Sequence, residues 1–225
     1  MTQYQLAVLD MAGTTVADDG LVVEAFTRAI ASAGVEAGTA DYDRKLAYVH
    51  ETMGESKIAV FRALLDRDEE GAQAANTAFE AAYGELVEAG RCAPIDGAEG
   101  SIRALRDAGV KVALTTGFGR PTQDAILTAL GWTDLADLTL CPADAGRGRP
   151  YPDMVLTAVL RLGVDDLRAV AVVGDTVYDV LTGLRSGAAV SAGVLTGAHG
   201  RTAFEAAGAT HILDSIRDLP ALLQG

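Results

Sequence analysis

The chain has 225 residues, of which 49% are hydrophobic and 22% charged, a composition typical of a folded globular protein. This length can bury a sizeable core and suggests one large or two modest domains. The formal net charge of −13 opposes binding to nucleic acids and to anionic membranes, so we expect neither as a partner. An anionic substrate would need local positive charge or a metal ion to hold it.

Neither the start of the chain nor its cysteines indicate export. The residues before the first apolar run contain no basic segment and no long apolar segment, so we expect no signal peptide. No apolar run approaches the roughly 20 residues of a membrane-spanning helix. Cys92 and Cys141 lie far apart and form no paired motif, which indicates two reduced thiols. We therefore expect a cytoplasmic protein.

The first predicted element is a buried strand from Leu6 to Leu9. Four apolar residues in a row are typical of a strand in a parallel sheet that helices cover on both faces. The run ends in Asp10, at the end of the strand where open α/β sheets bind ligands. An isolated acid at this place is equally typical of a turn cap, and later stretches of the chain decide between the two interpretations.

A helical segment follows the first strand. From Leu21 to about Gly90 apolar residues recur at intervals of three and four, as in Ile58, Phe61 and Leu64. We expect helices over residues 21–33, 41–51, 56–65 and 69–89. The segment predicts a helical cap of residues 17–91 inserted into a second domain.

Strands and helices alternate over the rest of the chain. We expect strands at residues 110–114, 138–140, 169–173, 190–195 and 211–213. The helices between them are expected at residues 98–108, 121–130, 153–162 and 178–185. Such alternation indicates a parallel sheet with right-handed crossovers. The predicted fold class is α/β, with a Rossmann-like catalytic core of residues 1–16 and 92–225 and an inserted helical cap.

Polar groups follow the ends of several predicted strands, and a parallel sheet brings such groups to one edge. They are Asp10, Thr115, Thr116, Gly117, Arg149, Asp175 and Asp179. Crowded carboxylates repel one another unless a cation lies between them, and oxygen ligands at an open site suit Mg²⁺. Hydroxyl groups, backbone N–H groups and a guanidinium suit a phosphoryl oxyanion. We therefore expect a magnesium site beside a phosphoryl-binding site.

This order of motifs resembles the haloacid dehalogenase superfamily over the whole chain. The matching stretches are Asp10–Thr14, Thr115, Arg149 and Asp175–Asp179. The resemblance implies that Asp10 is a nucleophile towards phosphorus. It also implies that Asp10, Asp175 and the backbone carbonyl of Ala12 bind Mg²⁺, with Asp179 as a ligand or as support.

The chain departs from the usual family pattern at Ala12, where an aspartate commonly protonates the leaving group. Alanine donates no proton, and general-acid assistance contributes roughly 10²–10⁴-fold, so an ordinary phosphatase would be handicapped. The phosphonoacetaldehyde hydrolase branch has alanine at this place and an arginine before Pro-Tyr-Pro. Ala12 and Arg149 match both features. The alternative for Ala12 is a decayed, inactive relative.

The caps of that branch carry a Met-Gly-x-x-Lys motif, which here begins at Met53 and ends at Lys57. The resemblance implies that Lys57 forms a Schiff base with a substrate aldehyde. The iminium is an electron sink, so C–P cleavage yields a neutral enamine and needs no oxygen acid at Ala12. We expect the carboxylate of Glu55 to point away from the amine. The alternative for Lys57 is a solvated lysine on a helix face.

Two further positions depart from the branch. Gly20 replaces a cysteine and Val60 replaces a histidine that assist imine formation and proton transfer in the family. His50 is a candidate replacement for that histidine, the alternative being an ordinary helix residue. The stretch from Asp18 to Gly20 predicts a hinge between core and cap. These departures leave the exact substrate open.

Three functional hypotheses follow. The first is a Mg²⁺-dependent hydrolase that cleaves the C–P bond of phosphonoacetaldehyde or a related 2-oxoalkylphosphonate, through an aspartyl-phosphate on Asp10 and a Schiff base on Lys57. The second is a small-molecule phosphate-ester phosphatase whose acid comes from solvent or the cap, with Glu55 as the nearest candidate. The third is a catalytically silent ligand-binding relative. The expected partner is a small phosphonate or phosphate substrate, and the resemblance suggests a homodimer.

Overall fold

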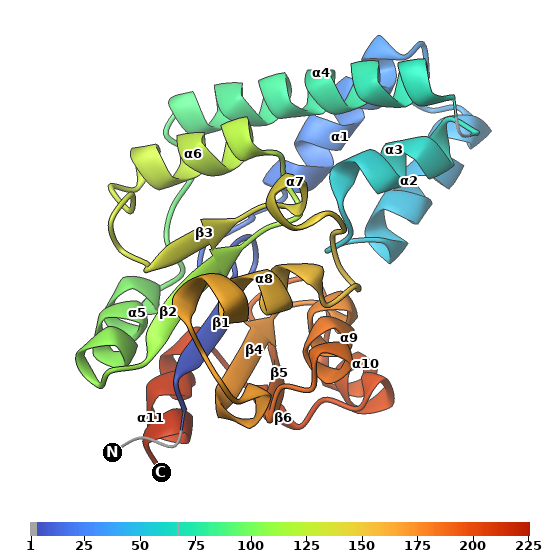
Figure 1. Ribbon diagram of the computed structural model, residues 1–225. Helices are drawn as coiled ribbons and strands as arrows, with labels where there is room; N and C mark the ends of the chain where they lie inside the picture. The colour runs from blue at the N-terminus through green and yellow to red at the C-terminus, as the bar shows by residue number, and fades with distance from the viewer. Residues whose placement is uncertain (1–3, 67) are drawn as a thin grey trace.

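The computed structural model describes residues 4–66 and 68–225, and its centre is a six-stranded sheet (Figure 1). The strands are β1 (Leu6–Asp10), β2 (Lys111–Thr115), β3 (Leu138–Leu140), β4 (Val170–Gly174), β5 (Val190–Val194) and β6 (His211–Leu213). Their spatial order is β3-β2-β1-β4-β5-β6, and all neighbouring pairs are parallel. All six expected strands are present, and the predicted α/β fold is confirmed.

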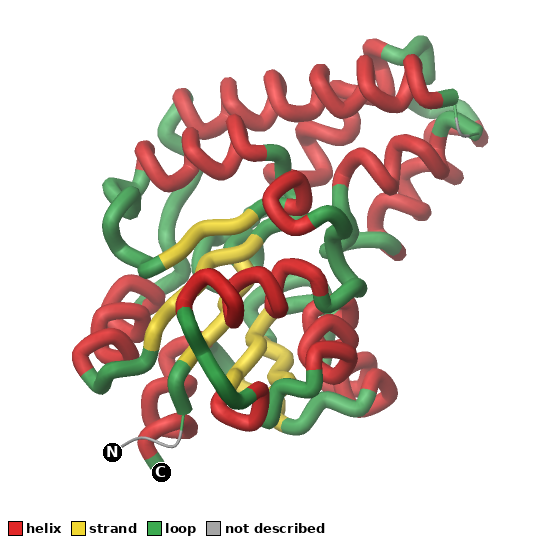
Figure 2. Tube along the Cα trace, viewed as in Figure 1, coloured by secondary structure: helices red, strands yellow, loops and turns green. Residues whose placement is uncertain are grey.

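Helices cover both faces of the sheet, which is why its central strands are fully buried (Figure 2). Val8 points to the face that carries α8, whereas Leu9 points to the face that carries α5. The helices of the core are α5 (Ala98–Asp107), α6 (Arg120–Ala129), α7 (Pro142–Ala145), α8 (Asp153–Leu162), α9 (Val177–Ser186), α10 (Arg201–Ala207) and α11 (Leu219–Gln224).

The topology places a crevice between β1 and β4. From β1 the chain moves outward to β2 and β3, and then returns to β4 on the opposite side of β1. Loops diverge at such a reversal, and the space at the carboxyl ends of the two strands becomes a ligand site. Asp10 is the last residue of β1 and Asp175 directly follows β4, so both acids lie at this crevice.

Four helices fill the stretch between β1 and α5, as the apolar spacing predicts. They are α1 (Leu21–Ser32), α2 (Ala40–Glu51), α3 (Lys57–Leu64) and α4 (Glu69–Glu88). Within the described part of residues 21–90 there is no strand. The division into a core of residues 1–16 and 92–225 and a cap of residues 17–91 stays a prediction. Residues 1–3 of the core and residue 67 of the cap lie outside the described residues. No described helix is both long and apolar enough to cross a membrane.

The outgoing and returning segments of this insertion are hydrogen-bonded to each other. The Ala17 N–H donates to the Ala93 carbonyl at 2.9 Å, and the Ile95 N–H donates to the Thr15 carbonyl at 2.9 Å. Val16 also forms an antiparallel bridge with Pro94. The insertion therefore leaves and re-enters the core through one paired neck.

The sequence analysis does not predict several short elements in the second half of the chain. The structure adds α7, α10, α11 and the 3₁₀ helices η1 (Leu167–Ala169) and η2 (Ile216–Asp218). Only Phe204 is buried in α10, so this helix has no apolar repeat to reveal it. In α11 a proline occupies the first turn, where helices tolerate it.

An aromatic cluster joins the helical insertion to the core. Its members are Phe26, Phe61, Phe79, Tyr83 and Phe118, all buried. The ring centroids of Phe26 and Phe79 are 4.7 Å apart, as are those of Tyr83 and Phe118. Because Phe118 lies in the loop after β2, the cluster holds α1, α3 and α4 against the catalytic edge of the sheet.

The central position of Phe79 in this cluster predicts a large loss of stability on truncation. Phe79→Ala should lower the free energy of unfolding by about 3–5 kcal/mol, because it removes a fully buried ring from contact with four others. Urea denaturation followed by circular dichroism measures the change. The control Leu160→Ala, at a position 80% exposed, should change it by less than about 0.5 kcal/mol. Equal effects of the two substitutions would contradict the prediction.

Candidate active site

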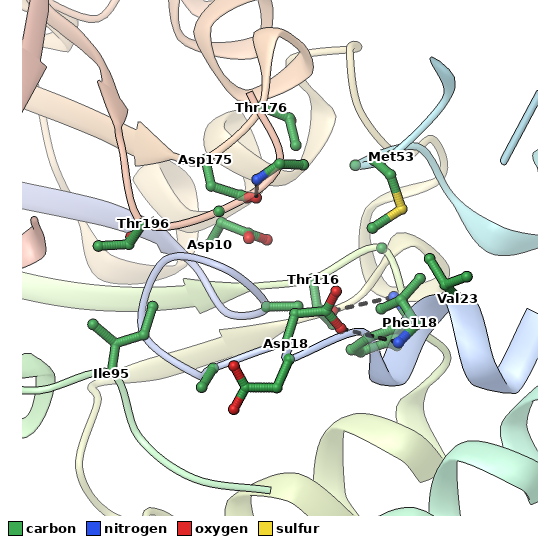
Figure 3. Close-up of a pocket in the computed structure, with 18 of the residues that line it drawn as sticks. Asp10, Asp18, Val23, Met53, Ile95, Thr116, Phe118, Asp175, Thr176 and Thr196 are labelled. Atoms are coloured by element: carbon green, nitrogen blue, oxygen red, sulfur yellow. Dashed lines mark hydrogen bonds between the residues drawn. The ribbon is translucent and has the colours of Figure 1, made fainter. Parts of the chain in front are cut away.

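A cavity of about 700 Å³ opens at the carboxyl edge of the sheet, beneath the helical insertion. Its lining includes Asp10, Ala12, Met53, Lys57, Thr116, Gly117, Arg149 and Asp175. Figure 3 shows Asp10 and Asp175 close together, with Met53 facing them across the cavity. The fold therefore brings motifs from the core and from the insertion into one site.

The turn after β1 fixes the Asp10 side chain. Thr15 Oγ1 donates a hydrogen bond to the Asp10 carbonyl at 3.0 Å, and Thr14 Oγ1 lies 3.5 Å from Asp10 Oδ2, to which it donates. Gly13 has φ 84°, and a Cβ there would lie 2.3 Å from Asp175 Oδ2. Glycine is therefore required both by the left-handed backbone and by the close approach of the second acid.

Arg149 joins two of the acids. Its Nη1 lies 2.7 Å from Asp10 Oδ1 and also forms an ion pair with Asp179 Oδ1. Burial opposes the charge of Arg149, but the two carboxylates outweigh it and raise the pKa of the guanidinium. Arg149 Nε is buried with no hydrogen-bond partner among the described residues. This N–H is available to a ligand oxyanion in the cavity.

Asp175 and Asp179 are held by backbone groups at the start of α9 and after β5. Asp175 Oδ2 accepts a hydrogen bond from the Ala198 N–H at 2.8 Å. Asp179 Oδ2 accepts from the Thr176 N–H at 3.2 Å and from Thr176 Oγ1 at 2.5 Å, which forms the capping box of α9. Asp179 therefore supports both a helix and Arg149.

The three carboxylates form a cluster that fits a divalent cation. Oxygen atoms of Asp10, Asp175 and Asp179 lie within 4.8 Å of one another, and all three residues are buried. One guanidinium balances a single charge of the three, so the cluster retains excess negative charge. Buried carboxylates at this spacing are suitable ligands for a hard cation such as Mg²⁺.

The protonation of these acids reflects their burial. Burial raises the pKa of Asp10 well above its usual range, Arg149 opposes the rise, and the neighbouring carboxylates add to it. Burial and the charge of Asp179 raise the pKa of Asp175 to about 6. A bound cation favours the ionised carboxylates and works against both shifts.

The three expected phosphoryl-binding residues after β2 separate in the structure. Thr116 and Gly117 line the cavity. Thr116 Oγ1 also accepts a hydrogen bond from the Phe118 N–H at 3.2 Å, which tightens the turn. The Thr115 hydroxyl instead donates to the Leu9 carbonyl at 3.4 Å, and Thr115 is not among the lining residues.

The motif loop of the insertion packs directly on the core. The Lys57 N–H donates to the Gly117 carbonyl at 3.2 Å. A Cβ on Gly54 would lie 2.4 Å from Thr176 Oγ1, so a larger residue would separate the two parts. Met53, at the start of the motif, lines the cavity. The structure therefore shows the helical insertion closed onto the catalytic edge.

Lys57 is the first residue of α3 and is only 6% exposed. Its Nζ lies 5.6 Å from the ring centroid of Phe26 and 5.4 Å from that of Phe118. Burial first and the charge of Arg149 second lower the pKa of Lys57 to about 8, against the opposing effect of nearby carboxylates. The alternative of a solvated lysine on a helix face is therefore wrong.

The positions at which the chain differs from the phosphonoacetaldehyde hydrolase pattern, and the residues suggested as replacements, differ in burial and in whether they line the cavity. Val60 is buried in the apolar core, and Gly20 is exposed. His50 is exposed and lines the cavity. Glu55 is half-buried and is not among the lining residues, and the hydroxyl of the nearby Tyr178 donates to the Glu51 carbonyl at 3.4 Å. Burial first and Glu55 second raise the pKa of Tyr178 to about 12, so the Glu55 carboxylate faces Tyr178.

Sequence reasoning missed two parts of the site. Thr196 and Ala198 line the cavity from the loop after β5, and Thr196 Oγ1 donates to the Gly13 carbonyl at 2.7 Å. The signal was available, because this loop follows a predicted strand at the same edge of the sheet. Asp18 also lines the cavity, although its sequence context predicts only a hinge.

Comparison with known proteins agrees with this geometry. A sequence model of the haloacid dehalogenase-like hydrolases matches residues 4–187. The chain belongs to this family. It is a hydrolase, and the resemblance drawn from its motifs is confirmed.

Individual relatives of this hydrolase carry two kinds of name. A phosphonoacetaldehyde hydrolase from Bacteroides fragilis is 30% identical, over 100% of this chain and 97% of that protein. The crystal structure of a phosphonoacetaldehyde hydrolase-like protein from Oleispira antarctica gives a TM-score of 0.81 at 25% identity, covering 98% of this chain and 91% of that one. A predicted phosphoglycolate phosphatase from Haemophilus somnus gives a TM-score of 0.81 at 19% identity, covering 100% of both chains. The last likeness shows a shared fold alone.

The burial of Lys57 predicts a pH-dependent cost to stability. The folded pKa of about 8 lies below the ordinary lysine value of about 10.4, so folding opposes the charge at neutral pH. Lys57→Met should raise the free energy of unfolding by about 3 kcal/mol at pH 7. This gain should shrink as the pH rises from about 8 towards 10, where the unfolded state also loses its proton. Denaturation of both proteins between pH 6.5 and 10 measures it, and a gain that stays constant would contradict the prediction.

Proposed function

We propose that the protein hydrolyses the C–P bond of phosphonoacetaldehyde or a related 2-oxoalkylphosphonate. The observation that carries the proposal is a buried lysine of lowered pKa in the same cavity as the Asp10 carboxylate. Ala12, which stands where many family members carry a general acid, supports it further. A substrate that supplies its own carbonyl to Lys57 has no need of that acid.

Lys57 prepares the substrate for cleavage. Its neutral amine adds to the aldehyde carbon, and loss of water from the adduct leaves an iminium that links Lys57 to the substrate. A pKa of about 8 leaves an appreciable fraction of the amine neutral near physiological pH. The rings of Phe26 and Phe118 beside Nζ limit access of water to the iminium.

Asp10 then attacks phosphorus through a carboxylate oxygen. The P–O bond forms as the C–P bond breaks, and the C–P electron pair moves into the iminium to give a neutral enamine. Water hydrolyses the aspartyl-phosphate to phosphate and the free carboxylate. The enamine takes a proton on carbon, and hydrolysis of the resulting iminium releases acetaldehyde, or the corresponding carbonyl product, and restores Lys57.

The anionic end of the substrate needs positive partners in this acidic chain. Arg149, whose Nε has no hydrogen-bond partner among the described residues, lines the cavity together with Thr116 and Gly117, and these residues offer N–H donors to an oxyanion. Asp10, Asp175 and Asp179, with the Ala12 carbonyl as a further ligand, would hold Mg²⁺. When bound, this ion neutralises negative charge on the phosphoryl oxygens.

A phosphate-ester phosphatase is the alternative within the same family. Its leaving group would need a proton, and Glu55, the acid that the sequence offers, faces Tyr178 outside the cavity lining. The relatives named as phosphatases share the fold at identities too low to carry a substrate. The position of Glu55 therefore favours C–P cleavage.

A substrate panel tests the proposal. With Mg²⁺ present, kcat/KM for phosphate release from phosphonoacetaldehyde should exceed that for any simple phosphate ester by at least about 10²-fold, because ester cleavage lacks a general acid. Asp10→Asn should abolish release, and EDTA should suppress it until Mg²⁺ is added in excess. A broad ester profile would support the phosphatase instead, and ligand binding without any release would support the silent relative.

Covalent trapping tests the imine. Borohydride added during turnover of phosphonoacetaldehyde should inactivate the protein and leave a reduced adduct on the peptide that contains Lys57. Lys57→Ala should give no adduct and no phosphate, whereas Lys111→Ala, at an exposed position, serves as the matched control and should behave as wild type. Full turnover by Lys57→Ala would rule out the imine route.

A further inference from the structure

Imine chemistry at Lys57 requires a group that moves protons. The ammonium must lose a proton before it attacks a carbonyl, and the hydroxyl of the resulting carbinolamine must gain one before it leaves as water. Among the acids that line the cavity, Asp10 is paired with Arg149, and Asp175 accepts the Ala198 N–H within the metal-binding cluster. Asp96 forms an ion pair with Arg217, and Asp19 is exposed. A different acid must therefore serve Lys57.

Asp18 is placed for this task. It lies in the paired neck just before α1 and lines the same cavity as Lys57 (Figure 3). Its Oδ1 accepts the Val22 N–H at 3.0 Å and so satisfies one free N–H of the first turn of α1, whose N-cap residue is Gly20. The described residues provide no hydrogen-bond donor or cation in contact with its Oδ2. One carboxylate oxygen is thus fixed by the helix while the other remains available.

Asp18 and Lys57 both lie beside α1. Phe26, two turns along α1 from the capped end, is one of the two rings beside Lys57 Nζ. The charges of Asp18 and Lys57 stabilise each other: Asp18 raises the pKa of the lysine, and Lys57 lowers that of the acid. Of the carboxylates that act on Lys57, Asp18 has the largest effect.

We propose that Asp18 is the acid–base partner of Lys57 in imine formation. Its carboxylate takes one proton from the Lys57 ammonium, and the neutral amine then adds to the carbonyl carbon. A second proton passes from nitrogen to the carbinolamine oxygen. Asp18 returns its proton to that hydroxyl, the C–O bond breaks, and water leaves. The ammonium and the aldehyde are thereby converted into an iminium and one water, with the carboxylate restored.

This role rests on the proposed function and fits the charges around both groups. Arg149, Asp10 and Asp175 also act on Lys57, while Asp19 of the same loop acts on Asp18. On α4, burial first and the charge of Asp18 second raise the pKa of the Tyr83 hydroxyl. Burial raises the pKa of Asp18 and lowers that of Lys57, so their proton affinities converge, which favours transfer between them.

The test compares two substitutions of adjacent acids by the amide. Asp18→Asn keeps a side-chain oxygen for the Val22 N–H, because the amide oxygen of asparagine also accepts hydrogen bonds, but its amide does not serve as a general acid or base. Asp19→Asn makes the same charge change at an exposed neighbour whose φ of 40° asparagine tolerates. Thermal unfolding of both variants verifies that the fold is retained.

The first measurement is the single-turnover rate of the borohydride-trapped adduct on Lys57 with phosphonoacetaldehyde. Asp18→Asn should slow it by about 10²-fold or more, the size of a general acid–base contribution, with little change in KM. Asp19→Asn should stay within about threefold of wild type. Asp18→Glu should recover part of the rate, because it restores a proton-transfer group.

The second measurement needs no turnover. Trace acetylation of Lys57 with acetic anhydride, followed by peptide mass mapping across pH, gives the pH at which half of the amine is reactive. Asp18→Asn should lower this midpoint, because a carboxylate that stabilises the ammonium is removed, whereas Asp19→Asn should leave it in place. A purely structural cap would leave the midpoint unchanged in both variants.

The outcomes separate this proposal from the one on which it rests. An adduct that forms in Asp18→Asn at the wild-type rate, with an unshifted Lys57 midpoint, overturns the role of Asp18 and leaves C–P hydrolysis standing. A wild-type protein that forms no adduct and releases no phosphate from phosphonoacetaldehyde overturns both.

Discussion

The ion cluster formed by Arg149 with Asp10 and Asp179 is the interaction on which the rest of the site depends. Three acids gathered in a buried crevice repel one another, and Arg149 balances only part of their charge. Removing one partner from such a buried cluster typically lowers the free energy of unfolding by about 3–5 kcal/mol, because a buried charge is left without its partner. The cluster also joins the end of β1 to the start of α9, since Asp179 caps that helix. The same ion pairs therefore balance the charge of the acids and hold the end of β1 and the start of α9 in position.

The cavity holds two groups whose proton affinities burial moves in opposite directions. Burial raises the pKa of Asp10 and lowers that of Lys57, because it disfavours the charged form of each. Arg149 counteracts the first shift and strengthens the second. A single guanidinium thus favours a carboxylate that can attack phosphorus and an amine that can attack a carbonyl. The use of both nucleophiles on one substrate is consistent with a single small cavity.

The sequence predicts those features that depend on one segment at a time. The six strands are recognisable because each is a short run rich in apolar residues, buried throughout in β1, β4 and β5. The site residues Asp10, Arg149 and Asp175 are recognisable because parallel strands end at one edge. The contacts of Lys57 with Phe26 and Phe118 join three distant segments, and no local pattern encodes them. For the same reason the local pattern around Asp18 predicts only a hinge, and it does not predict that the Thr115 hydroxyl donates to the Leu9 carbonyl of the neighbouring strand.

The closed position of the insertion connects these contacts to reactivity. The Lys57 N–H donates to the Gly117 carbonyl, and the lack of a side chain at Gly54 lets the motif loop approach Thr176 closely. These contacts hold the loop that carries the lysine against the core. The lowered pKa of Lys57 exists only while its amine is buried. Any movement that lifts the loop would hydrate the amine and return it towards an ordinary, protonated lysine. The amine is therefore nucleophilic at neutral pH only in the arrangement that also places it in one cavity with Asp10, which couples closure to the first chemical step.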